Sequence, residues 1–140
     1  MTDQIPLAGV VGSPIAHSRS PVLFAHWLRV NGLKGHYVPL HISQADLRET
    51  LPLLPKMGFV GINVTIPHKE TVWTMADVIT DRAALIGAAN TLTFRQGKVY
   101  ADNTDGHGFI ANLRQAVPDW DAKQGPAAIL GAGGASRAVI

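Results

Sequence analysis

Polar side chains interrupt one strand-like stretch near the middle of the chain. Between Val60 and Ile66, apolar residues alternate with Gly, Asn63 and Thr65, so one face can pack while the other presents an amide and a hydroxyl. Asn is a poor strand residue, which suggests that Asn63 is there to hydrogen-bond something. Pro67 cannot continue a central strand, so the chain should turn there and carry Lys69 above the strand's carboxyl end. Open α/β sheets bind ligands at that edge, and these residues therefore predict a small-molecule site with a cation beside it.

Two serines near the N-terminus form a second polar cluster. In His17-Ser18-Arg19-Ser20-Pro21, the hydroxyls of Ser18 and Ser20 stand immediately before an expected helix. A helix N-terminus favours negative charge, so this arrangement suits the carboxylate of a substrate. The alternative is that Ser20 acts only as the N-cap of that helix.

Two further clusters come at the expected ends of other strands. Asn90 lies in Gly87-Ala88-Ala89-Asn90-Thr91, and Asp105 lies in Asp102-Asn103-Thr104-Asp105-Gly106. Asp105 could do no more than complement the dipole of the helix that follows, and Lys69 alone could be a solvated surface lysine. The occurrence of all these clusters at strand ends favours a shared site.

Reduction of a carbonyl group would suit these residue types. When hydride reaches a ketone carbon, negative charge grows on the oxygen, and the Lys69 ammonium could stabilise that charge or donate a proton. Asp105 would orient the hydroxyl and the lysine, and the choice of base between Lys69 and Asp105 stays open. His68 and His17 are rival proton carriers because histidine titrates near neutrality. The six histidines show no ligand spacing with carboxylates, so no metal site is expected.

A glycine-rich segment near the C-terminus is typical of nucleotide binding. The expected strand Ala127 to Leu130 leads into Gly131, Ala132, Gly133, Gly134 and Ala135. Such a turn lets backbone amides approach a pyrophosphate at a helix N-terminus, although Ser136 stands where the fingerprint's third glycine would be. An ordinary glycine-rich turn is the alternative. Because a dinucleotide unit needs about 30 residues, the chain is expected to be a fragment of a longer enzyme and to be inactive by itself.

Composition excludes several other classes of protein. The 140 residues, 46% hydrophobic and 16% charged, are enough for one core, and a net charge of +2 without basic runs argues against nucleic acid. The absence of cysteine excludes disulfides and thiolate metal sites. No apolar run reaches membrane length and the first residues are unlike a signal peptide, so we expect a cytoplasmic protein that does not bind membranes.

The pattern of apolar runs predicts an α/β fold with an open, mostly parallel sheet flanked by helices. Helix-like segments separate the strands, with a break near Ile79 to Asp81, and Thr104 is expected to cap a helix that ends before Pro118. We expect a substrate-binding and catalytic domain at 1–103, and a linking helix with the incomplete start of a Rossmann-type domain at 104–140. The expected strands are Leu7 to Gly12, His36 to Ile42, Val60 to Ile66, and a hairpin of Ala89 to Phe94 with Val99 to Ala101 around Gln96-Gly97.

Together the five motifs closely resemble those of the shikimate dehydrogenase family, in the family's order and over almost the whole chain. The resemblance implies NADP-dependent, reversible reduction of 3-dehydroshikimate to shikimate in aromatic amino-acid biosynthesis. It also implies that Lys69 and Asp105 form the catalytic pair. The residues expected to hold the substrate are Ser18, Ser20, Asn63, Thr65, Lys69, Asn90 and Asp105. A broader quinate/shikimate dehydrogenase and a non-catalytic metabolite sensor stay open, as does a homodimer.

Overall fold

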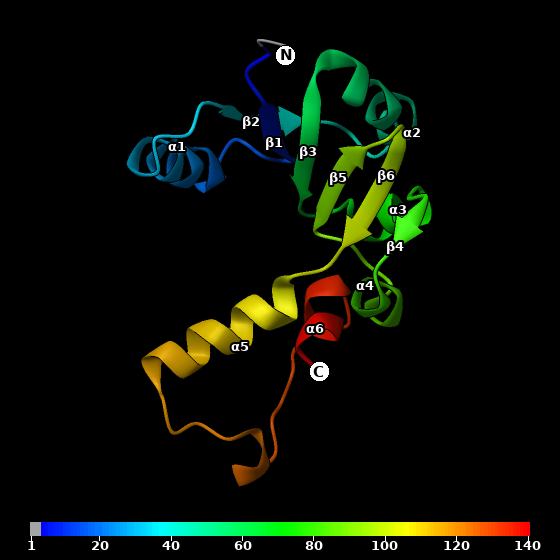
Figure 1. Ribbon diagram of the computed structural model, residues 1–140. Coiled ribbons are helices and arrows are strands. Elements are labelled where there is room, and N and C mark those ends of the chain that lie inside the picture. The colour runs from blue at the N-terminus through cyan, green and yellow to red at the C-terminus, as the bar shows by residue number, and fades with distance from the viewer. Residues whose placement is uncertain (1–3) are drawn as a thin grey trace.

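The computed structural model describes residues 4–140, which form one mixed six-stranded sheet with helices around it (Figure 1). The strand order across the sheet is β2-β1-β3-β5-β6-β4. The strands are β1 (Leu7–Gly12), β2 (His36–His41), β3 (Phe59–Val64), β4 (Val78–Ile79), β5 (Thr91–Arg95) and β6 (Lys98–Asp102).

The predicted α/β sheet is confirmed, with three parallel and two antiparallel pairings. β1 pairs in parallel with β2 and β3, and β4 pairs in parallel with β6. β5 runs antiparallel to both β3 and β6. The predicted hairpin is β5 and β6, joined by Gln96 and Gly97 with positive φ of 53° and 70°, as a two-residue hairpin turn requires. β4 lies at the predicted break between helical segments and was not predicted as a strand, because two residues carry no periodic signal.

Some helices pack against the sheet, whereas α5 and α6 belong to a segment that extends from it. The helix α1 contacts β1 and β2, whereas α5 extends away from the sheet and α6 returns to lie against α5 and α4 (Figure 1). The α-helices are α1 (Ser20–Val30), α2 (Leu47–Thr50), α3 (Lys69–Thr74), α4 (Asp81–Ile86), α5 (Asp105–Ala116) and α6 (Gly134–Val139). No helix within residues 4–140 is long and apolar enough to cross a membrane.

The core is built from the central strands and the segment that follows β2. Its buried side chains are Val11, Ile42, Leu47, Leu51, Leu54, Phe59, Ile62, Val64, Val72, Ala89, Leu92 and Ala101. The alternation predicted for β3 holds only in part: Ile62 and Val64 are buried, but Val60 is 48% and Ile66 65% exposed. Val60 stands near the strand's start, and Ile66 lies beyond its end at Val64, in the turn that Pro67 was predicted to cause.

The predicted strand Ala127 to Leu130 is wrong. These residues are exposed and have no regular structure, because no strand in the described part of the chain lies beside them to share backbone hydrogen bonds. The helix expected after the glycine-rich turn does form, as α6. Since α6 packs against α4 and α5 of the same chain, the segment from 134 onward has a partner within the molecule.

Candidate functional site

The lysine and the aspartate singled out in the sequence meet across the fold. Lys69 begins α3, two residues after the turn that ends β3, and Asp105 begins α5. The Lys69 Nζ donates to the Asp105 Oδ2 at 2.6 Å, and the two side chains are 17% and 27% exposed. The partly open pair leaves the ammonium accessible to a ligand while its position is held by the carboxylate.

A buried asparagine fixes the start of the helix that carries Asp105. The Asn103 side chain is 2% exposed, donates through Nδ2 to the Ala88 carbonyl at 2.9 Å, and accepts the Asp105 backbone N–H at 3.0 Å. The expectation that Thr104 caps this helix holds for its position but not for its side chain, which makes no cap hydrogen bond. The sequence analysis missed Asn103 because a local Asx turn cannot be separated from a polar loop without knowing what is buried.

The neighbouring Asp102 ties the turn before α5 to a second part of the chain. Its carboxylate accepts from the Thr80 hydroxyl at 2.7 Å and the Arg82 Nε at 2.6 Å, and it also pairs with the Arg82 Nη2. The hydrogen bonds from Arg82 hold the pKa of Asp102 well below its usual range, with a smaller contribution from Thr80. The turn is therefore tied to α4 as well as to the loop before β5.

Asn90 joins the Lys69–Asp105 pair through the second carboxylate oxygen of Asp105. The Asn90 Nδ2 donates to the Asp105 Oδ1 at 2.8 Å and to the Thr104 hydroxyl at 2.9 Å. Both oxygens of Asp105 thus have a donor, one from Asn90 and one from Lys69. The sequence-predicted residues Lys69, Asn90 and Asp105 form one hydrogen-bonded cluster.

Asn63, on β3, is oriented by side chains from two other strands, β2 and β5. Its Oδ1 accepts from the Tyr37 hydroxyl at 2.8 Å, and its Nδ2 donates to the Thr91 hydroxyl at 3.3 Å. The Thr91 hydroxyl donates in turn to the Asn90 Oδ1 at 3.0 Å. Hydrogen bonds therefore connect Asn63 to the cluster around Asp105.

Tyr37 is a site residue that the sequence analysis missed. It lies opposite Ala8 of β1, whose small side chain lets the phenol reach across β1 to Asn63 on β3. Its ring stacks on Phe24 with centroids 4.0 Å apart. Burial raises the pKa of Tyr37 to about 12, partly offset by a hydrogen bond from Ser20. The signal for Tyr37 lies in the register of three strands, which the sequence alone does not reveal.

The two predicted carboxylate-binding serines lie at the start of α1. Ser20 is the first residue of the helix rather than its cap, and Ser18 Oγ accepts the Ser20 backbone N–H at 3.3 Å. The alternative that Ser20 is an N-cap is therefore wrong. Phe24, on the same helix as Ser20, stacks on Tyr37, which in turn bonds Asn63. Thr65 follows β3 and donates its backbone N–H to the Val11 carbonyl at 2.9 Å.

Neither His17 nor His68, the two histidines considered as proton carriers, makes a hydrogen bond with Lys69 or Asp105. His68 is fully buried, and its Nε2 lies 2.7 Å from the Ile42 carbonyl, so the ring is engaged away from Asp105. His17 is exposed. Across residues 4–140 no group of three histidine or acidic side chains is placed to hold a metal ion.

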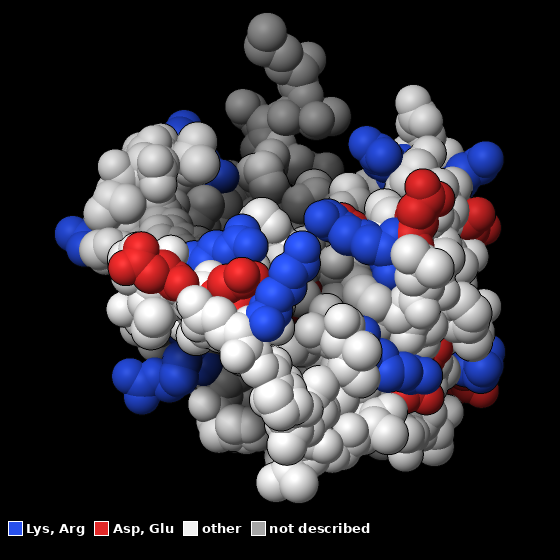
Figure 2. All heavy atoms as spheres, turned by 90° about the horizontal axis from the view of Figure 1, so that it is seen from below, with Lys and Arg blue, Asp and Glu red and all other residues white. Residues whose placement is uncertain are grey.

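The glycine-rich turn and Lys69 line one hollow of about 380 Å³. The turn contributes Gly133, Gly134 and Ala135, whereas Gly131 and Ala132 lie exposed outside the hollow. Three of the five predicted cofactor residues are thus brought next to the predicted catalytic lysine. Figure 2 shows the face below the sheet, where acidic and basic side chains are interspersed rather than gathered by sign.

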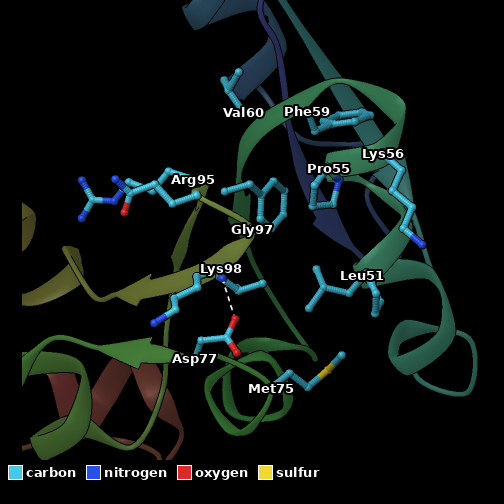
Figure 3. A pocket seen from close by; sticks show the side chains of 14 residues that line it. Leu51, Pro55, Lys56, Phe59, Val60, Met75, Asp77, Arg95, Gly97 and Lys98 are labelled. Carbon is cyan, nitrogen blue, oxygen red and sulfur yellow. Dashed lines mark hydrogen bonds between the residues drawn. The ribbon is translucent and has the colours of Figure 1, made fainter.

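A larger hollow, of about 550 Å³, lies at the opposite end of β3 (Figure 3). Its walls include Leu51, Phe59 and Met75, with the tip of the β5–β6 hairpin on one side. Its carboxylate, Asp77, already accepts the Val99 backbone N–H at 2.7 Å. The residues predicted to bind substrate or cofactor do not line this hollow.

Comparison with known proteins finds a matching family and similar proteins. Residues 10–92 match the family described as the shikimate dehydrogenase substrate binding domain. A shikimate dehydrogenase (NADP(+)) of Cereibacter sphaeroides is 69% identical over 138 residues, which are 98% of this chain and 50% of that protein.

Solved structures match as well. The crystal structure of shikimate dehydrogenase from Aquifex aeolicus has a TM-score of 0.91 at 40% identity, covering 100% of this chain and 52% of that one. Shikimate 5-dehydrogenase from Thermus thermophilus, in complex with NADP(H) and shikimate, has a TM-score of 0.86 at 37% identity, covering 97% and 50%. The chain spans about half the length of the curated relatives it matches. By the match over residues 10–92, more than half of the chain, and the agreement of the solved structures with its fold, the chain belongs to the shikimate dehydrogenase substrate-binding domain family.

Proposed function

We propose that the full-length protein catalyses the NADP-dependent, reversible reduction of 3-dehydroshikimate to shikimate. The observation that carries this proposal is the Lys69–Asp105 pair, 2.6 Å apart and bonded to Asn90, because Lys69 also lines the hollow that the glycine-rich turn lines. Relatives named as NADP-dependent shikimate dehydrogenases support the choice of substrate and cofactor.

The cofactor would bind beside Lys69. Gly133, Gly134 and Ala135 fit a dinucleotide because they bring no large side chain into the hollow. When bound, reduced NADP supplies the hydride for the substrate's carbonyl carbon.

Residues of this chain would stabilise the charge on the carbonyl oxygen and transfer the proton. As negative charge develops on the carbonyl oxygen, the Lys69 Nζ donates a proton to it, and in the reverse direction the same nitrogen accepts the proton of the alcohol. Asp105 holds Lys69 through Oδ2 and is itself held by Asn90 through Oδ1. This arrangement orients the ammonium before the substrate arrives.

The remaining predicted residues would hold the substrate away from the reacting carbon. Ser18 and Ser20 would bind the carboxylate, and Asn63, Thr65 and Asn90 would contact ring hydroxyls. Tyr37 donates a hydrogen bond to Asn63 and stacks on Phe24 of α1, the helix that also carries Ser20, so Tyr37 joins the two ends of the proposed binding site. The homodimer and the cytoplasmic location stay predictions.

Steady-state kinetics of the full-length protein would test the function. With NADP, we expect turnover of shikimate and a lower kcat/KM for quinate. Equal kcat/KM values would favour the broader quinate/shikimate enzyme instead. Calorimetric binding of shikimate without turnover would identify a sensor, although a sensor has no need of the Lys69–Asp105 pair.

Tyr37→Phe should raise KM for shikimate by roughly 5- to 30-fold while lowering kcat less, because it leaves Asn63 without the donor that orients it. The substituted ring keeps its stacking on Phe24. Leu33→Ala, at an exposed apolar side chain after α1, is the control and should leave both constants unchanged. If Tyr37→Phe had wild-type KM, Tyr37 would have no part in orienting Asn63.

A further inference from the structure

We propose that Arg137 and Glu70 are positioning residues that set the glycine-rich turn at a fixed place relative to Lys69. This inference rests on the proposed function, since the purpose of the placement would be to align the cofactor with the substrate. Neither residue carries a role in the chemistry derived above.

The two residues form an ion pair between distant parts of the chain. The Arg137 Nη2 lies 2.6 Å from the Glu70 Oε1, although the residues are 67 positions apart. Glu70 directly follows Lys69 on α3, and Arg137 lies on α6, directly after the glycine-rich turn. The pair therefore joins the segment that carries the catalytic lysine to the segment that would carry the cofactor's phosphates.

The exposure of the pair argues against a role in overall stability. The side chains of Arg137 and Glu70 are 39% and 62% exposed, and ion pairs this accessible to water contribute little to the free energy of folding. A short contact can still define the relative position of two helices that are otherwise free to shift. We therefore assign the pair to geometry rather than to stability.

Two glycines let the backbone of α6 approach the catalytic elements closely. A Cβ on Gly134 would lie 2.8 Å from the Cβ of Ala88, and one on Gly106 would lie 2.1 Å from the Ala138 carbonyl oxygen. Ala88 accepts a hydrogen bond from Asn103, and Gly106 directly follows Asp105. The helix α6 thus rests on the same turns that orient Asp105, beside α4 and the start of α5 (Figure 1).

The glycine contacts limit how near α6 can come, and the ion pair resists its departure. Contact alone does not prevent α6 from sliding or lifting, because it offers no specific attraction at a defined point. The Arg137–Glu70 pair supplies that attraction on the side of α3. A shift of the turn would change the hollow that Lys69 and Gly134 both line. Hydride transfer is sensitive to small displacements of the cofactor relative to the substrate.

The test uses the full-length enzyme with Arg137→Gln, Glu70→Gln and the charge-exchanged double variant Glu70→Arg with Arg137→Glu. Arg114→Gln, at an exposed arginine of α5, is the control. Each single variant should lower kcat by roughly 10-fold and raise the primary isotope effect measured with deuterated reduced cofactor, because hydride transfer becomes slower relative to product release. Calorimetry should show the Kd for NADP changed by less than about threefold, since the phosphate-binding amides move together with the turn and keep their arrangement relative to one another.

A second measurement reports on the placement without any catalysis. Amide hydrogen exchange in residues 131–138 should quicken in Arg137→Gln and Glu70→Gln, and the charge-exchanged variant should restore slow exchange together with most of the kcat. Unchanged exchange in the single variants would overturn the proposal, as would a charge-exchanged variant no better than the singles. A wild-type enzyme that failed to turn over shikimate would refute the proposed function, whereas the exchange comparison would still decide the role of the pair.

Discussion

Lys69→Ala in the full-length enzyme should lower kcat by a factor on the order of 100 to 10,000, with little change in KM for shikimate. The reason is that the Lys69 ammonium meets its strongest interaction only as charge develops on the carbonyl oxygen, so its loss affects the transition state more than the bound substrate. The measurement is steady-state kinetics in both directions, with both substrates varied.

Lys98→Ala is the matched control for this prediction. Lys98 is an exposed lysine on the hairpin side of the larger hollow, at the opposite end of the sheet, and its removal should leave kcat unchanged. A kcat within about threefold of wild type in Lys69→Ala would remove this residue from the chemistry, since general acid–base groups contribute far more than that.

Asp105→Asn should also lower kcat by roughly 100-fold or more, and it should raise KM more than Lys69→Ala does. The carboxylate accepts from Lys69 on one oxygen and from Asn90 on the other. An amide has only one acceptor oxygen, so its NH₂ group must face one of these donors and displace it. Both the orientation of the lysine and the proposed contact with the substrate would then be lost.

The double variant Lys69→Ala with Asp105→Asn tests whether the two residues act as a unit. If they do, the double variant should be about as slow as the slower single variant, because groups that act together are not additive. Circular dichroism of each variant should show an intact fold. Fully additive effects would mean that Asp105 acts independently of Lys69.

Residue patterns within a few positions predicted much of the local structure. The Gln96-Gly97 turn, the helix that follows Ser20-Pro21, and the turn at Pro67 each depend on backbone preferences of adjacent residues. For the same reason Lys69 could be placed after a turn at the carboxyl end of a strand, and Asp105 at the start of a helix. Such preferences act between neighbours along the chain and are present in the sequence itself.

The wrong prediction of a strand at Ala127 to Leu130 shows where reasoning from neighbouring residues stops being sufficient. Its composition suits a strand, but a strand exists only where a neighbour shares its hydrogen bonds, and the described part of the chain places none beside it. The exposed side chain of Ile66 is a second case, since the alternation of β3 was extended past the point where the strand ends.

By itself, the sequence determined which residues could carry chemistry and that they stand near the ends of strands and helices. Only the tertiary structure decided their partners: Tyr37 with Asn63, Asn103 with Asp105, and Arg137 with Glu70. Each of these contacts depends on strand register or helix packing, which is set by the burial of many side chains at once rather than by the preferences of the two residues. The type of each functional group is therefore given by the sequence at one position, whereas its orientation depends on the packing of the whole fold.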